Sequence, residues 1–172
     1  MGTIIGFSIF SALLLFGFMA AGVVRFGLQP SYSDYSRFWE KAVPINNMNL
    51  WSIVTCVAAF LICPALLELG TASVWQFLGF LVPVYLIVVT LTPDWYKNRK
   101  QFIVHTISAI LCSIGAFLWC LFVMEAWVVL LLVAAFIFIV AIASGTGRSS
   151  LVFWLELFMF LSVYIVVFLA LL

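Results

Sequence analysis

Six apolar stretches, each close to the length that a helix needs to cross a lipid bilayer, make up most of this chain. They cover residues 3–24, 48–67, 74–92, 102–123, 127–144 and 151–172. A crossing helix takes roughly 20 apolar residues, because the hydrocarbon core is about 30 Å thick. The stretches also lack the polar–apolar alternation of barrel strands. We therefore expect an all-α polytopic membrane protein, with residues 1–172 forming one domain, a bundle of six transmembrane helices.

The composition supports this class. Hydrophobic residues make up 67% of the 172 residues and charged residues 8%, against about 45–50% and 25% in soluble domains. The net charge is +1 and no basic stripe occurs, so a nucleic-acid partner is not expected. The expected partner is the lipid bilayer. A membrane-protein partner or a homo-oligomer is a further hypothesis.

All the basic residues fall on one side of the six-span arrangement. They follow the first, third and fifth stretches: Arg25, Arg37, Lys41, Lys97, Arg99, Lys100 and Arg148. Lys and Arg in short loops stay on the cytoplasmic side of a membrane. We predict a protein of the plasma or bacterial inner membrane, with loops 25–47, 93–101 and 145–150 in the cytoplasm and both termini outside.

Two connections need separate comment. The connection 25–47 is long and polar, and it favours a short interfacial helix around Tyr35–Lys41. The turn between the fourth and fifth stretches is weakly marked, with Glu125 as its only charge and no Gly or Pro. A single helix across both stretches would be about 60 Å long, so we predict two crossings there.

Only two ionisable side chains lie well inside a predicted span, and such groups are costly enough to be candidate functional residues. His105 and Glu156 each lie within two turns of the basic side, at depths that differ by roughly 3 Å. Asp94 and Ser33 belong to the same side, and Ser108 shares a helix face with His105. These five residues form a candidate polar pocket, with His105 as proton acceptor or ligand and Glu156 as its partner.

Structural explanations for the same residues stay open. Glu156 could pair with Arg148 or with the first turn of its own helix, and His105 could extend toward the headgroups. Small residues along the fourth stretch suit close helix packing. Pro64 and Pro83 predict helix kinks, which occur both beside ligand cavities and as purely structural features.

Three short motifs carry a family resemblance: the Ser31–Ser36 run, Pro93-Asp94, and His105-Thr106-x-Ser108-Ala109. Their order resembles small multi-span bacterial membrane proteins distantly grouped with the alkaline ceramidase and adiponectin-receptor hydrolases. Those hydrolases bind zinc through several histidines and also use Ser and Asp, on a seven-helix bundle. The resemblance implies that Asp94 corresponds to the family's Asp and His105 to one of its histidines. The other histidines and one helix have no counterpart in this chain.

Three functions are compatible with these features. The favoured one is a structural or partner-binding bundle without enzymatic activity, because the chain has little polar machinery. The second is a small transporter or lipid-binding carrier that uses a His105/Glu156 pocket and the kinks at Pro64 and Pro83. The third is an intramembrane hydrolase of the resembling type. A single histidine cannot supply a three-His metal centre, so we expect no metal and no other cofactor.

Overall fold

The computed structural model describes residues 1–43, 49–147 and 149–172, and every regular element in these ranges is helical. The elements in chain order are α1 (Gly2–Phe26), the 3-10 turn η1 (Tyr32–Asp34), α2 (Tyr35–Ala42), α3 (Leu50–Leu69), α4 (Phe77–Thr90), α5 (Arg99–Leu118), the π-helical turn η2 (Trp119–Val123), α6 (Trp127–Ala143) and α7 (Leu151–Leu171). Four of them are long and apolar enough to cross a membrane: α1, α3, α5 with its η2 continuation, and α7. The apolar helices α4 and α6 are shorter, at 14 and 17 residues.

Each predicted apolar stretch contains one helix, and the boundaries differ by a few residues for local reasons. Helix α4 begins three residues later than predicted, because residues 70–76 form consecutive turns with backbone hydrogen bonds such as Gln76 N–H to Ser73 O. Helix α5 begins three residues earlier, because Asn98 caps it by accepting the Lys100 N–H at 2.9 Å. The short helix predicted in the first connection is α2. Residues 44–48, where the second stretch was predicted to start, and Arg148 lie outside the described residues.

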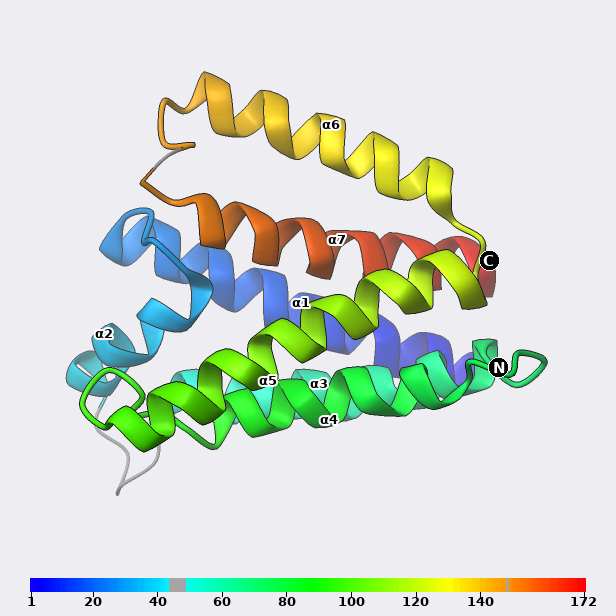
Figure 1. The fold of residues 1–172 in the computed structure, drawn as a ribbon, viewed down its shortest axis with the longest axis horizontal. Coiled ribbons are helices and arrows are strands. Elements are labelled where there is room, and N and C mark those ends of the chain that lie inside the picture. Colours follow the sequence, from blue (N-terminus) through cyan, green and yellow to red (C-terminus); the bar gives the residue numbers. More distant parts are fainter. Residues whose placement is uncertain (44–48, 148) are drawn as a thin grey trace.

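The long helices run back and forth, so that loops gather at the two ends of the bundle (Figure 1). Both chain termini lie at one end, together with the turns 70–76 and 124–126. The segment with α2 and the connections after α4 and α6 lie at the other end. The Lys and Arg residues that the structure describes all lie in these segments or in the adjoining end turns of α1 and α5. We call this the basic end.

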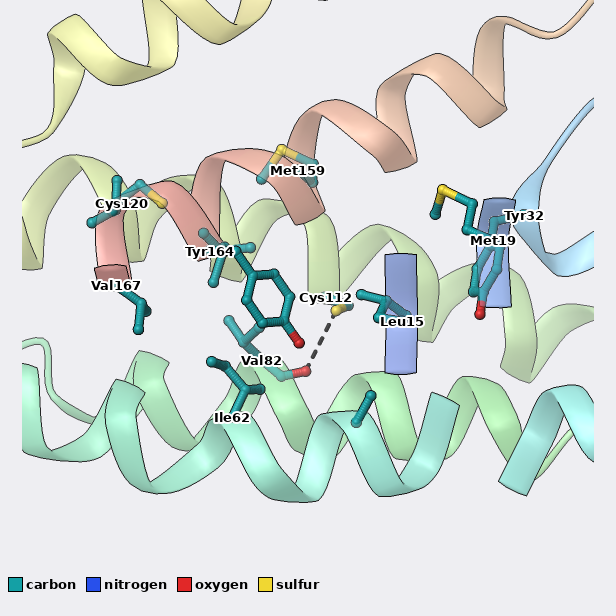
Figure 2. Packing of buried hydrophobic residues seen from close by; sticks show 14 of the residues in the cluster. Leu15, Met19, Tyr32, Ile62, Val82, Cys112, Cys120, Met159, Tyr164 and Val167 are labelled. Carbon is teal, nitrogen blue, oxygen red and sulfur yellow. Dashed lines mark hydrogen bonds between the residues drawn. The ribbon is translucent and has the colours of Figure 1, made fainter. Parts of the chain in front are cut away.

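Side chains from five helices meet in the core (Figure 2). Leu15 of α1, Ile62 of α3 and Tyr164 of α7 surround the contact between α4 and α5, where Cys112 Sγ donates to the Val82 carbonyl at 3.4 Å. Helix α6 is peripheral: it packs mainly against α7, with a smaller contact to η2. The central contacts of the bundle therefore come from α1, α3, α4, α5 and α7, and α6 adds the buried side chains Leu130, Val133, Ile137 and Ala141 at its contact with α7.

Small residues bring α4 close to its neighbours. A Cβ on Gly79 would lie 2.6 Å from the Leu66 carbonyl oxygen of α3, and one on Gly115 of α5 would lie 3.3 Å from a Val82 methyl group. The His105, Ser108, Cys112 and Gly115 stripe is buried along α5. This agrees with the packing explanation for the small residues of that helix.

The closest of these approaches makes a stability prediction. Gly79→Ala should lower the free energy of unfolding by about 1–3 kcal/mol, because the backbone of α3 cannot move away as a flexible side chain would. Gly17→Ala in α1 is the control, since no atom lies within 4 Å of a Cβ there. Both can be measured by reversible denaturation in mixed detergent micelles. Equal stabilities of the two variants would contradict the prediction.

Candidate ligand-binding groove

Helices α5 and α7 enclose a groove of about 630 Å³, within the range of about 300–1,000 Å³ that small-molecule pockets occupy. The two helices approach each other near η2 and separate toward the basic end (Figure 1). In the first connection, Pro30, Ser31, Ser33 and Asp34 line the groove at that end, and Trp95 forms part of its wall. No described residue of α6 lines it.

The groove is polar at one end and apolar along its sides. The polar side chains near the basic end are Ser31, Ser33, Asp34, His105, Thr106 and Glu156. The apolar sides include Phe102, Ile110 and Ile114 of α5 and Val152 and Leu155 of α7, whose exposed fractions lie between 47% and 54%. Because these half-exposed side chains belong to the outer faces of the two helices, the groove opens sideways onto the apolar surface of the bundle.

Glu156 holds the first connection against α7. Its Oε2 accepts the backbone N–H of Tyr32 at 2.6 Å, and the Phe153 N–H donates to the Pro30 carbonyl at 2.9 Å. The Phe153 N–H is in the first turn of α7, where backbone donors lack partners within the helix. These two bonds fix segment 27–34, which leaves α1 through Gly27 with a positive φ of 73°.

Tyr32 anchors this segment in the core. Its ring is 2% exposed and packs against Trp51 and Phe160, and its hydroxyl is 3.0 Å from Thr55 Oγ1 of α3. Burial raises the pKa of the Tyr32 phenol well above its ordinary value. The phenol therefore stays protonated and hydrogen-bonded, which suits a structural role.

The tautomer of His105 follows from its neighbour Thr92. The single hydroxyl proton of Thr92 is donated to the Val89 carbonyl at 2.8 Å, so Oγ1 can only accept from His105 Nδ1, 3.0 Å away. In the neutral imidazole Nδ1 then carries the proton and Nε2 keeps its lone pair. Trp95 stacks on the ring with 5.0 Å between centroids. The imidazole is held in place, with one acceptor left for a ligand.

Asp34 also lines the groove, but its carboxylate already has partners. Oδ2 accepts the Ser31 N–H at 3.1 Å in a capping box, and Oδ1 lies 3.3 Å from the Arg37 guanidinium. Arg37 therefore offsets the charge of Asp34. Among the described residues, no salt bridge joins a Lys or Arg to Glu156.

The structure brings three of the five predicted pocket residues to the groove: His105, Glu156 and Ser33. Ser108 is buried in α5 and does not line it. Asp94 is at the surface, where Oδ1 lies 3.0 Å from Lys97 Nζ. The alternative pair of Glu156 with Arg148 lies outside the described residues.

A second cavity, of about 60 Å³, continues toward the bundle centre, and both Glu156 and Ser33 line it as well. Pro83 lines this inner cavity, whereas Pro64 lines neither space. Only one of the two prolines therefore lies beside the predicted pocket.

Sequence reasoning did not identify Thr92, Trp95 and Asp34 as members of the site. Thr92 and Trp95 lie just after α4, where a small polar residue and an interfacial Trp are common in any membrane helix. Asp34 is in the Ser/Tyr run, so its position near the basic end was available as a signal. No pattern in the sequence relates Thr92 to His105.

The described residues contain no group of three or more His, Cys, Asp and Glu side chains arranged to hold a metal ion. No family model, curated protein or solved structure matches the chain. The fold defines an all-helical protein with four helices apolar and long enough for a membrane. The resemblance to the ceramidase and adiponectin-receptor hydrolases stays a prediction.

Proposed function

We propose that this chain is an integral membrane protein that crosses the bilayer six times and binds one lipid in the groove between α5 and α7. The groove's form is the observation that carries the proposal. A lipid combines a polar headgroup with apolar chains, and the groove combines a polar end with apolar sides that open on the outer helix surface. A molecule already dissolved in the bilayer could enter sideways without passing through water.

Six crossings are supported by the arrangement of the two shorter helices. Helix α4 lies against both α3 and α5, and α6 lies against α7. The three neighbours α3, α5 and α7 are long enough to cross, α5 together with its η2 continuation. At 1.5 Å per residue, α4 and α6 are about 21 and 26 Å long. Bilayers thin locally around short helices at modest cost, and the turns at 70–76 and 124–126 lie at the same end of the bundle (Figure 1).

A second candidate function is partner binding through α6. One side of this helix packs on α7, while Leu131, Leu132 and Phe138 on other sides are 63–66% exposed. In a six-span protein these side chains would face lipid or another membrane protein. For this function we expect the protein to purify in mild detergent with a fixed companion or as a homo-oligomer. Polar substitutions on α6 should dissociate that complex.

Filling the groove tests the lipid proposal. Ala109 lines both the groove and the inner cavity, so Ala109→Trp should reduce the amount of phospholipid retained on the purified protein at least about tenfold. Ile103→Trp is the matched control, because Ile103 is 47% exposed on the same helix and lines neither space. Native mass spectrometry of the full chain reports the bound lipid.

The comparison requires that both variants fold. Thermal unfolding in the same detergent should give similar midpoints for the two Trp variants. If Ala109→Trp is too unstable, Ser113→Phe fills the same space from one turn further along α5. A folded groove-filling variant that keeps as much lipid as the Ile103→Trp control would refute the proposal.

A further inference from the structure

We infer that the lipid bound in the groove carries a primary ammonium next to its phosphate, as an ethanolamine phospholipid does. This inference rests on the proposed lipid-binding function and names the headgroup for the same site. Two adjoining regions of opposite charge carry it: the acidic polar end of the groove and a basic depression beside it.

The polar end of the groove is rich in acceptors, and no cationic side chain is among its described lining residues. Its described lining includes the carboxyl groups of Glu156 and Asp34 and no Lys or Arg. Arg37 offsets Asp34, whereas Glu156 accepts one backbone hydrogen bond and has no described cationic partner. An ionised carboxylate in an apolar surrounding is costly unless an opposite charge lies nearby. A cationic headgroup would supply that charge.

The nature of the free acceptors favours a cation with N–H groups. Glu156 keeps Oε1 free of any described hydrogen bond, and His105 keeps the lone pair of Nε2. An R–NH₃⁺ group has three N–H donors for such acceptors, whereas a trimethylammonium group has none. The aromatic rings of Trp95, Phe102 and Phe158 would attract either cation. Hydrogen bonding therefore favours binding of the primary amine over the quaternary amine, and charge favours binding of both over an anionic headgroup.

The basic depression provides a place for the phosphate. It measures about 450 Å³, shares Trp95 and Phe102 with the groove, and is lined by Arg37, Lys97 and Arg99. Lys97 is already paired with Glu40 and Asp94, at 3.2 and 3.0 Å. No described acidic residue forms a salt bridge with Arg99. Guanidinium groups suit phosphate because their donors match its oxygens two at a time.

The two regions together match a zwitterionic headgroup in one orientation. The ammonium lies in the acidic end of the groove, the phosphate lies at the basic rim near Arg99, and the acyl chains follow the apolar sides toward the open face. A single-chain amine would use the first region but not the second. An anionic phospholipid would use the second but place no cation beside Glu156.

The test is a titration of the full chain with lipids of identical acyl chains and different headgroups. We expect phosphatidylethanolamine to bind about tenfold more tightly than phosphatidylcholine, and phosphatidylglycerol to bind more weakly than phosphatidylethanolamine. Competition by a long-chain primary alkylamine is included to test whether an amine binds without the phosphate. Equal affinities for the three phospholipids would overturn the inference. Binding of the alkylamine by a protein that does not bind phosphatidylethanolamine would overturn it as well.

Substitutions at the two regions make the test specific. Glu156→Gln keeps an oxygen for the Tyr32 N–H and removes the charge, so it should abolish the preference for phosphatidylethanolamine over phosphatidylcholine. Glu68→Gln, an exposed residue at the other end of the bundle, should leave the preference unchanged. Arg99→Gln should weaken both phospholipids by a similar factor. A folded Glu156→Gln protein that retains the full preference would contradict the inference.

The failure of this inference can be told apart from failure of the proposed function. If Ala109→Trp removes bound phospholipid but the headgroup makes no difference, the groove binds lipid and the headgroup assignment is wrong. If Ala109→Trp removes no phospholipid, the groove is not the lipid site and the proposed function itself is wrong.

Discussion

Tyr32→Ala is expected to lower the free energy of unfolding by about 3–5 kcal/mol, a large effect for one residue in a connection between helices. The side chain is 2% exposed and fills the space between α3 and α7, in contact with Trp51 and Phe160. Its removal leaves a cavity and also leaves Thr55 without the phenol partner. The backbone bond from residue 32 to Glu156 should weaken as the segment loses its anchor.

Tyr32→Phe is the matched control, since it keeps the ring and removes only the hydroxyl. The lost hydrogen bond to Thr55 should lower the free energy of unfolding by about 0.5–1.5 kcal/mol. Both variants can be unfolded by graded denaturant in micelles and followed by tryptophan fluorescence. If the alanine variant were no less stable than the phenylalanine variant, the segment would not be anchored by this ring.

Single cysteines placed at the two ends of the bundle are expected to differ completely in labelling from outside the cell: those at one end should react and those at the other should not. In a chain whose four native cysteines are replaced, Ala72→Cys and Glu125→Cys should react with a membrane-impermeant maleimide added outside intact cells. Ser149→Cys should react only after the membrane is opened. The reason is that short loops with Lys and Arg stay in the cytoplasm, and the described basic residues are all at the end of the bundle that contains residue 149.

These positions are chosen because all three residues are exposed and none lines the groove. The result also counts crossings. If α4 did not cross, only α5 would cross between residues 72 and 125, so these two residues would lie on opposite sides and only one of the two variants would be labelled in intact cells. Labelling of Ala72→Cys and Ser149→Cys from the same side would refute the six-span topology.

The helices could be predicted from the sequence because their positions depend on the length of apolar stretches alone. Two helix starts differed where local hydrogen bonds form, at the turns 70–76 before α4 and at the Asn98 cap of α5. The π-helical turn after Leu118 was not predicted, because one wide turn changes neither the length nor the composition of the stretch. The peripheral position of α6 also could not be predicted, since apolar side chains suit lipid and helix neighbours equally well.

Only part of the candidate groove could be predicted from the sequence. Position in a span gives the depth of a residue in the membrane, but not the direction in which its helix turns it. His105 and Glu156 were grouped by their similar distance from the basic side, and both line the groove. Ser108 has a suitable depth, but Ala109 is the neighbouring residue that faces the groove, because helix rotation is set by packing. Asp94 has a suitable side but forms an exposed ion pair with Lys97.

The hydrogen bond between Tyr32 and Glu156 has a consequence for biosynthesis, because its partners are 124 positions apart in the chain. Ribosomes add roughly 5–20 residues per second, so the segment after α1 emerges on the order of ten seconds before the helix on which it docks. During that interval α7 is not yet present for Tyr32 to pack against, and its backbone donor has only water or headgroups as partners. Helix α7 therefore completes a loop that was synthesised well before it, and a chain truncated before residue 151 should leave that loop open to added protease.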